Sequence, residues 1–202
     1  MVKVCGMRDT ENIRQVDALG IDLIGFIFYP KSSRYVSDRP AYLPTNCKRV
    51  GVFVDSTIKD ILQHITDYKL DLVQLHGHES PDFISQLRAL CGDSIAIIKA
   101  FNIATEEDLA ATTPYTGLVD YFLFDTKGPS AGGNGKKFDW SVLVAYNGDT
   151  PFLLSGGIGP DDAESIKAFR HPKCIGIDLN SRFEIEPGIK DIVKLKMFLN
   201  YE

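Results

Sequence analysis

The stretch VGVFVDSTIKDILQHITDYKLDLVQL, residues 50–75, contains one complete strand–helix–strand unit. Its ends, residues 50–54 and 72–75, are short apolar runs without strict alternation, which is typical of strands buried on both faces of a sheet. Between them, Thr57 can cap a helix whose apolar residues recur at helical spacing as far as Ile65. Because parallel strands require a crossover of this kind, the stretch predicts one unit of a parallel sheet.

The same rhythm continues on both sides of this unit. The apolar runs are residues 2–5, 23–28, 50–54, 72–75, 95–100, 121–125, 152–155 and 175–179. Helical patterns fill most intervals, and their candidate starts are Asp9 or Thr10, Thr57, Ser80 before Pro81, Thr105, Pro160 and Ile189. The interval 38–46 is the exception, since its two prolines predict a short or distorted helix. Eight such units close a parallel sheet, so we predict an α/β fold with a single (β/α)8 TIM barrel over residues 1–202.

The composition is that of a globular, enzyme-sized domain. The chain is 44% hydrophobic and 24% charged, and its net charge of −5 argues against nucleic acid as the main partner. No apolar stretch approaches the length of a membrane span, and the N-terminus lacks the apolar region of a signal peptide. The cysteines are widely spaced, which favours reduced thiols over disulfides or a zinc site. We therefore expect a cytoplasmic protein that binds neither membrane nor nucleic acid.

Cys5 and Asp125 are candidate catalytic residues, because active sites of this barrel lie where the strands end. Cys5 is followed by Gly6, and a thiol there can act as base or nucleophile, although a buried cysteine is also a common core residue. Asp125 directly follows the apolar residues 121–124, where burial without a partner or a purpose is costly. Burial would favour the protonated form that a general acid needs; the alternative is an aspartate that caps the next loop.

Glycines and short polar residues follow the last two strands. Gly156 and Gly157 join the seventh strand to a helix, where glycines let backbone N–H groups approach an anion. Asp178, Asn180 and Ser181 end the eighth strand and can open a small extra helix. These two loops are the recurrent phosphate site of such barrels, so we predict a phosphorylated small-molecule substrate.

Arg34 and His76 are candidate substrate contacts. Arg34 follows the second strand and could bind a carboxylate through two hydrogen bonds, although an exposed loop arginine is the commoner case. His76 ends the fourth strand. We expect no metal at His76 and His78, because the sequence shows no second cluster of ligands at metal spacing. The glycine-rich residues 131–136 are by themselves as typical of a turn as of a ligand site.

Taken together, the strand ends resemble those of phosphoribosylanthranilate isomerases. The motifs are KVCG at 3–6, FYPKSSRY at 28–35, VGVFV at 50–54, VQLHG at 73–77, FDT at 124–126, GGNGKKFDW at 132–140 and LSGGI at 154–158. Each motif is weak alone, but their occurrence in order over essentially the whole chain is specific.

The resemblance implies a ketol-isomerase, formally an intramolecular oxidoreductase, of L-tryptophan biosynthesis. Such enzymes convert N-(5-phosphoribosyl)anthranilate to 1-(2-carboxyphenylamino)-1-deoxyribulose 5-phosphate by an Amadori rearrangement. By the same resemblance, Cys5 is the general base, Asp125 the general acid and Arg34 the contact for the anthranilate carboxylate. The residues that the resemblance assigns to substrate-binding loops are Gly133, Gly156, Gly157, Asn180 and Ser181. It implies neither cofactor nor metal, because the acid–base pair suffices.

Two residues depart from the family pattern. Arg8 stands where threonine is common, and Arg182 stands where glycine is common after the eighth strand. Arg182 either closes left-handed backbone conformations or adds a charge near the phosphate.

Two other functions stay open. A sister isomerase of a phosphorylated aminoaldose is expected to carry aspartate in place of Cys5, and a non-catalytic phosphate-binding barrel needs neither Cys5 nor Asp125. We expect a monomer or a homodimer.

Overall fold

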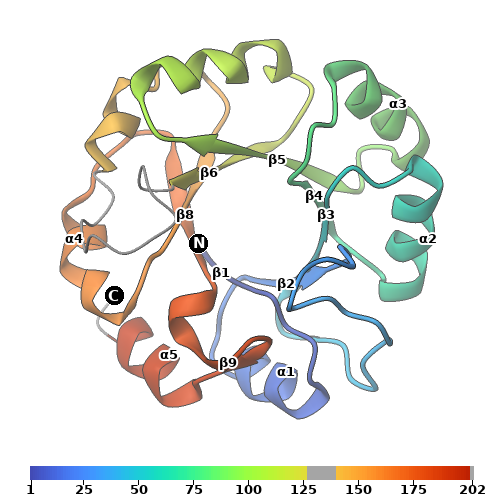
Figure 1. Cartoon of the computed structure of the whole chain (residues 1–202), viewed down its shortest axis with the longest axis vertical. Helices are drawn as coiled ribbons and strands as arrows, with labels where there is room; N and C mark the ends of the chain where they lie inside the picture. The colour runs from blue at the N-terminus through green and yellow to red at the C-terminus, as the bar shows by residue number, and fades with distance from the viewer. Residues whose placement is uncertain (127–139, 201–202) are drawn as a thin grey trace.

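The computed structural model describes residues 1–126 and 140–200, so Gly133 and the rest of the loop 131–136 lie outside the described residues. Eight parallel strands close into one barrel in the order β1 to β8 (Figure 1), which confirms the predicted fold. The strands are β1 (Val2–Cys5), β2 (Leu23–Ile27), β3 (Lys48–Phe53), β4 (Leu72–Leu75), β5 (Ala96–Ile103), β6 (Tyr121–Thr126), β7 (Phe152–Ser155) and β8 (Cys174–Leu179). Of these, β1, β4 and β7 have the predicted bounds.

Helices surround the barrel (Figure 1). The α-helices are α1 (Thr10–Asp17), α2 (Ile58–Tyr68), α3 (Pro81–Cys91), α4 (Ala163–Ala168) and α5 (Ile192–Leu199), and the 3₁₀ helices are η1 (Glu106–Tyr115), η2 (Trp140–Ala145), η3 (Pro160–Asp162) and η4 (Ser181–Phe183). The predicted caps Asp9, Thr57 and Ser80 each accept a hydrogen bond from a backbone N–H of the first turn. Within residues 1–126 and 140–200, no helix has the length and apolar character needed to cross a bilayer.

Strand alternation sorts the apolar residues into two clusters. The cluster that fills the barrel consists of Cys5, Leu23, Val50, Val52, Leu72, Ile98, Ala100, Leu123 and Leu153. The larger cluster packs between the sheet and the helices. Because successive side chains point to opposite faces, residues two places from an interior residue also face the interior. Lys3 and Asp125, two places from Cys5 and Leu123, therefore point into the barrel.

The sequence predicts a short or distorted helix between β2 and β3, but none forms (Figure 1). The buried carboxylate of Asp17 holds this segment instead. It accepts hydrogen bonds from Tyr42 Oη at 2.6 Å, Thr45 N at 2.9 Å and Asn46 N at 3.1 Å. Prolines in the segment remove backbone donors, so a side-chain acceptor takes the place of a helical hydrogen-bond ladder.

The last helix begins later than predicted. Ile189 and Lys190, expected at its start, form strand β10, which pairs with β9 (Glu184–Glu186) as a hairpin. Gly188 supplies the turn with a φ of +90°, a conformation that suits glycine and interrupts a helix. Asp191 then caps α5. The hairpin carries Glu184 and Lys190 to the end of the barrel where the strands finish.

Candidate active site

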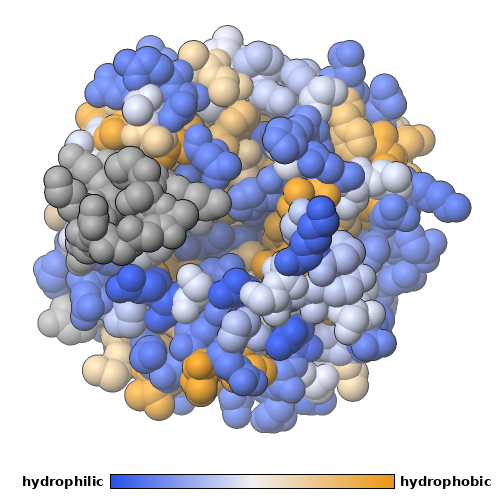
Figure 2. All heavy atoms as spheres, viewed as in Figure 1, coloured by the Kyte–Doolittle hydropathy of each residue, from blue (hydrophilic) through white to orange (hydrophobic). Residues whose placement is uncertain are grey.

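Cys5 and Asp125 face the interior at the C-terminal end of the barrel. Cys5 is the last residue of β1, and Asp125 is the last residue but one of β6. Figure 2 shows a hollow over the centre of the barrel, bordered mainly by hydrophilic residues. Cys5 is 3% exposed, whereas the Asp125 side chain is 15% exposed. The two candidate groups share one end of the barrel, and Asp125 is the more accessible.

Two buried lysines flank the Cys5 thiol. Burial raises the pKa of Cys5, while the charges of Lys3 and Lys190 act in the opposite direction. Gly25 lies beside Cys5 on β2 and makes room for the sulfur, because a β-carbon there would lie 2.7 Å from Sγ. Cys5 therefore rests as a thiol next to cations that can stabilise its thiolate.

Lys3 is paired with Asp178 where β1 meets β8. Lys3 Nζ lies 2.9 Å from Asp178 Oδ1, and both side chains are buried. Burial alone would lower the pKa of Lys3, but the charge of Asp178, together with the hydrogen bonds to Asp178 and Cys5, outweighs it and raises that pKa. The predicted substrate contact Asp178 is thus engaged by a lysine that sequence reasoning did not single out. The available signal was the spacing of Lys3 and Cys5, which puts both on one face of a strand.

His76 and Asp125 approach each other from different strands. His76 Nε2 lies 3.6 Å from Asp125 Oδ2, and His76 Nδ1 lies 3.1 Å from Gln74 Nε2. His78 does not join them, because its ring pairs with Asp55 at 3.0 Å and is almost fully exposed. Of the two neighbouring histidines, His76 is the one that belongs to the site.

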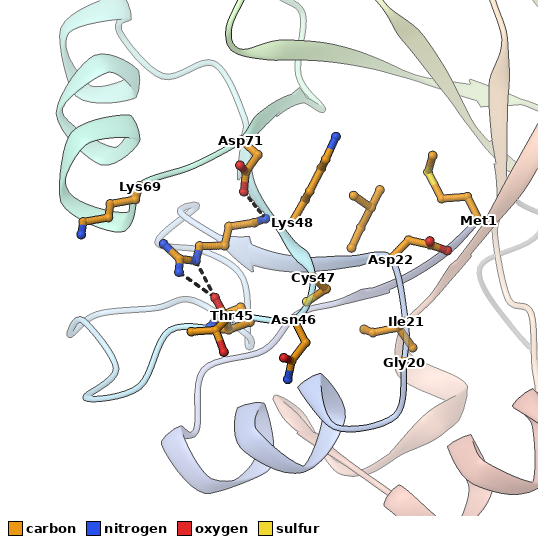
Figure 3. A pocket seen from close by; sticks show the side chains of 13 residues that line it. Met1, Gly20, Ile21, Asp22, Thr45, Asn46, Cys47, Lys48, Lys69 and Asp71 are labelled. Atoms are coloured by element: carbon orange, nitrogen blue, oxygen red, sulfur yellow. Dashed lines mark hydrogen bonds between the residues drawn. The ribbon is translucent and has the colours of Figure 1, made fainter.

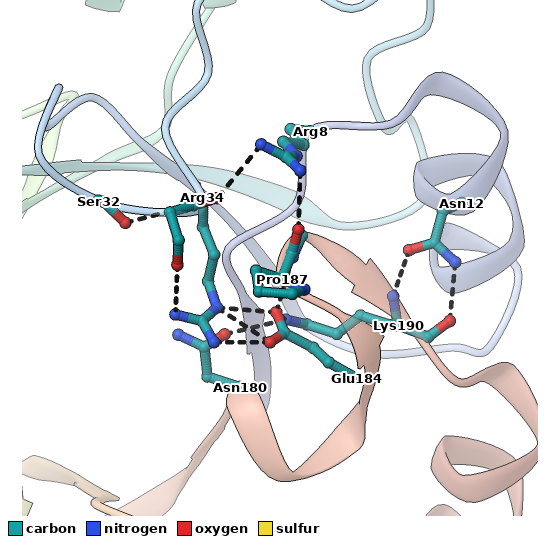
Figure 4. Close-up of polar contacts among 10 residues, drawn as sticks. Arg8, Asn12, Ser32, Arg34, Asn180, Glu184, Pro187 and Lys190 are labelled. Carbon is teal, nitrogen blue, oxygen red and sulfur yellow. Dashed lines mark hydrogen bonds and ion pairs between the residues drawn. The ribbon is translucent and has the colours of Figure 1, made fainter.

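Arg34 is held by Glu184 and is not a free loop arginine (Figure 4). Its Nε and Nη2 atoms donate to the two carboxylate oxygens at 2.8 and 2.7 Å. Lys190 Nζ donates to the same carboxylate from the opposite side at 2.6 Å. Burial acts to raise the pKa of Glu184, but the bonds from Arg34 and Lys190 outweigh it and lower that pKa. Nη1 also donates to Ser33 Oγ at 3.5 Å, which uses one of its two N–H groups. Because a guanidinium has five N–H groups, the other N–H of Nη1 and the second N–H of Nη2 can bind a second carboxylate.

Glu184 and Lys190 are site residues that sequence reasoning missed. Lys190 is 1% exposed and also donates to Asn180 Oδ1 at 2.9 Å. Burial lowers the pKa of Lys190, with Glu184 opposing. The hairpin that presents both residues is not visible as a strand pattern, and Lys190 lies within the predicted helix. The one available signal was Glu184 at the end of the segment after the eighth strand.

The two predicted phosphate loops lie against each other. Gly156 and Gly157 have φ values of +100° and +67°, which glycine accommodates without strain, and a β-carbon on Gly157 would meet nothing within 4 Å. A β-carbon on Gly159, in the same loop, would lie 3.2 Å from Arg182 Nε. Ser181 begins η4 and is exposed. Arg182 therefore places a guanidinium between the loops after β7 and β8.

A groove of about 780 Å³ opens at the opposite end of the barrel, where the strands begin (Figure 3). Polar side chains of the groove form hydrogen bonds with the backbone: Asp22 accepts a hydrogen bond from Val2 N, and Asp71 accepts one from Arg49 N. The Arg49 guanidinium donates to the carbonyl of Pro44. These contacts join the strand starts, and residues at this end of the fold serve stability.

The chain matches one family model over residues 2–201, described as N-(5'phosphoribosyl)anthranilate (PRA) isomerase. It is 54% identical over 205 residues to the N-(5'-phosphoribosyl)anthranilate isomerase of Parabacteroides distasonis, over 98% of this chain and 91% of the relative. It is 48% identical over 200 residues to the protein of the same name from Phocaeicola vulgatus, over 99% and 96% of the two chains.

Solved structures agree with this similarity. The phosphoribosylanthranilate isomerase of Thermotoga maritima superposes with a TM-score of 0.83 at 33% identity, over 99% of this chain and 97% of the other. A structure of such an isomerase in complex with reduced 1-(o-carboxyphenylamino)-1-deoxyribulose 5-phosphate superposes with a TM-score of 0.80 at 31% identity, over 99% and 96%.

Proposed function

We infer the roles of the site residues from the premise that the chain belongs to the family of N-(5'-phosphoribosyl)anthranilate isomerases. The chain is an isomerase of tryptophan biosynthesis that rearranges N-(5'-phosphoribosyl)anthranilate to the corresponding 1-deoxyribulose 5-phosphate. One observation carries the assignment of roles: a buried thiol, Cys5, and a more accessible carboxyl, Asp125, share the C-terminal end of the barrel. An Amadori rearrangement needs one proton donor and one proton acceptor at such a site.

Asp125 is the general acid of the first step. It donates its proton to the ribose ring oxygen as the bond between that oxygen and C1 breaks. The lone pair of the amine nitrogen forms the C1=N bond, so the product is an open-chain cationic Schiff base and Asp125 becomes a carboxylate. His76 Nε2, at 3.6 Å, is near enough to stabilise this carboxylate after a small movement.

Cys5 is the general base of the second step. As a thiolate it removes the proton from C2, the electrons of that bond form C1=C2, and the C1=N electrons return to nitrogen. The neutral enolamine then tautomerises to the ketone. Lys3 and Lys190 favour the thiolate against the effect of burial. The cationic Schiff base makes the C2 proton more acidic, so the acid step precedes the base step.

The two ends of the substrate are held by different parts of the site. Arg34 binds the anthranilate carboxylate with the edge of its guanidinium that Glu184 leaves open. The phosphate binds backbone N–H groups of Gly156 and Gly157. The other residues proposed to contact the substrate are His76, Gly133, Asp178, Asn180 and Ser181, of which Gly133 lies outside the described residues.

We place the enzyme in the cytoplasm as a monomer or a homodimer. A similar structure, with a TM-score of 0.80, is described as monomers generated from the dimeric isomerase of Thermotoga maritima. Light scattering of this chain after gel filtration decides between the two states.

Cys5→Ala and Asp125→Ala should each lower kcat by about 10²–10⁴-fold, the contribution of one general acid or base. The assay follows the loss of substrate fluorescence, and binding of the reduced product analogue is the control for an intact site. A Cys5→Ala enzyme that keeps a tenth of the parent kcat would show that another group is the base. A parent enzyme without this activity that still binds sugar phosphates would favour the non-catalytic binding barrel.

A further inference from the structure

Gln74 is a buried amide in a part of the barrel where an apolar side chain would be expected. It lies two places after the interior residue Leu72 on β4, and its neighbours in register are Val52 and Ile98. Gln74 is 1% exposed, and its Oε1 atom has no hydrogen-bond partner among the described residues. Barrel layers are usually filled by branched apolar residues, and a buried amide with an unpaired oxygen is destabilising. The amide therefore calls for a role other than packing.

The amide nitrogen is used for one contact, with His76. Gln74 Nε2 lies 3.1 Å from His76 Nδ1, and the other ring nitrogen, Nε2, lies 3.6 Å from Asp125 Oδ2. The three side chains thus form a line from the barrel interior to the candidate general acid. Gln74 and His76 come from one strand and its continuation, while Asp125 comes from β6.

We propose that Gln74 is a positioning residue that keeps His76 neutral, with its proton on Nε2 and directed at Asp125. An amide NH₂ group can only donate, so the ring nitrogen that faces it must be the acceptor. A second proton on Nδ1 would point an N–H group at another N–H group. With Nε2 toward the ring, as in the structure, Gln74 therefore selects one tautomer and disfavours the imidazolium, whereas a flipped amide would accept from Nδ1 through Oε1.

This selection matters for Asp125, and the inference rests on the proposed role of Asp125 as the acid. An imidazolium beside Asp125 would favour its carboxylate form and remove the proton that the first step needs. A neutral ring leaves that proton in place. Once Asp125 has passed its proton to the ribose ring oxygen, the Nε2–H group can donate to the new carboxylate and stabilise it.

Several other charged groups at this end of the barrel are paired with one another. Lys3 pairs with Asp178 at 2.9 Å, and Lys99 pairs with Glu79 at 3.1 Å. Among the described residues, Glu184 is paired with Arg34 at 2.7 Å and with Lys190 at 2.6 Å, and Cys5 is a further titratable group that faces the interior here. A pH effect on kcat that appears when Gln74 is replaced by a charged residue, and not when it is replaced by an uncharged one, can therefore be assigned to the contacts that join residue 74, His76 and Asp125.

Two substitutions of similar length separate positioning from packing. Gln74→Met removes the donor and leaves the site neutral, and Gln74→Glu replaces the donor with an acceptor that favours protonation of Nδ1. We expect Gln74→Met to lower kcat by roughly tenfold or more with little change in KM, because Gln74 is buried and acts through His76. We expect Gln74→Glu to be slower still at neutral pH, and its kcat relative to the parent at the same pH to recover toward acidic pH. Gln74→Met should show no such recovery.

The tautomer of His76 is the measurement that separates the two roles, because a change in packing at residue 74 alone would not alter it. The ¹⁵N spectrum of the substrate-free parent, assigned by comparison with His76→Asn, should show the proton on Nε2. Gln74→Met should give a mixture of tautomers, and Gln74→Glu should give an imidazolium or a proton on Nδ1.

A parent ring protonated on Nδ1 would overturn the proposal, as would a Gln74→Met enzyme with the parent kcat or a Gln74→Glu enzyme without acidic recovery. If Gln74→Glu does not fold, the parent spectrum and Gln74→Met decide alone. The spectrum requires no catalysis. An unexpected tautomer of His76 would therefore contradict the role of Gln74 alone, whereas an inactive parent enzyme would contradict the proposed function.

Discussion

Lys3, Cys5 and Asp178 form a buried set in which each charge has an identifiable effect on the thiol. Burial of Cys5 raises its pKa, Lys3 lowers it, and Asp178 raises it. The reaction needs Cys5 as a thiolate and Asp125 protonated at the same time, so the pKa of Cys5 sets the alkaline limb of the pH profile of kcat/KM. A raised pKa places this limb above the ordinary thiol value of about 8.5.

Lys3→Met and Asp178→Asn should move this alkaline limb in opposite directions. Loss of the Lys3 cation raises the pKa of Cys5 further, so the limb moves to higher pH and the rate at neutral pH falls. Loss of the Asp178 anion lowers the pKa of Cys5, so the limb moves to lower pH. The measurement is the pH profile of kcat/KM for parent and both variants. Shifts in the same direction would show general damage to the barrel in place of an electrostatic effect on Cys5.

Glu184→Gln should reduce the preference of the enzyme for a substrate that carries a carboxylate. The amide keeps the shape of Glu184 but loses the charge that orients Arg34, and a charge-assisted hydrogen bond is worth about 1.5–3 kcal/mol. The readout is the ratio of kcat/KM for the anthranilate substrate to that for an aniline analogue without the carboxylate. Lys190 also loses its partner, but a loss of stability affects both substrates equally. An unchanged ratio in Glu184→Gln and in Arg34→Lys would mean that another group binds the carboxylate.

Among the elements, the segment between β2 and β3 depends on one carboxylate. Burial acts to raise the pKa of Asp17, but the hydrogen bonds from Tyr42, Thr45, Cys47 and Asn46 outweigh it and lower that pKa. A lowered pKa means that Asp17 contributes stability above the unfolded value of about 3.9 and that the contribution is lost as the pH falls through the folded value.

Asp17→Asn should therefore lower the free energy of unfolding by about 1.5–3 kcal/mol at neutral pH. The difference between parent and variant should shrink when urea unfolding is repeated at acidic pH, below about 4. Asp93→Asn is the matched control, since Asp93 is exposed and its replacement should change stability by less than about 0.5 kcal/mol. A difference that persists in acid would point to packing of the side chain as the cause.

The same elements show which features a sequence can predict. The apolar runs predict all eight strands because a buried parallel strand is contiguous in sequence, and the caps Asp9, Thr57 and Ser80 are local as well. Pairing between distant segments is not local: Arg34 and Glu184 are 150 residues apart, and the hairpin that carries Glu184 has no alternation of its own. The positions of Cys5 and Asp125 follow from the strand ends, and Lys3 follows from its spacing to Cys5, whereas Gln74 and Lys190 become visible as their neighbours only when the barrel closes.

For the barrel as a whole, closure occurs where β1 meets β8. The amino group of Met1 donates to Ile175 O at 3.0 Å, and Met1 O accepts from Ile177 N at 3.0 Å. Gly176 lies between these contacts, and a β-carbon there would overlap the carbonyl oxygen of Met1. A barrel has no free edge, so disturbance of one strand pair removes hydrogen bonds and interior packing from the entire ring.

Gly176→Ala should therefore destabilise all of residues 1–202 together, by about 1–3 kcal/mol, the usual cost of an extra methyl group in a packed site. Trp140, the single tryptophan, begins η2 and lies outside the β1–β8 seam, so its fluorescence reports a different part of the molecule from the substitution. In urea, fluorescence and far-UV circular dichroism should give coincident transitions in the parent and coincident, equally displaced transitions in Gly176→Ala. A variant whose circular dichroism shifts while the Trp140 transition stays in place would show that the seam unfolds by itself. The chain would then consist of more than one cooperative unit, against the single domain that the strand rhythm predicts.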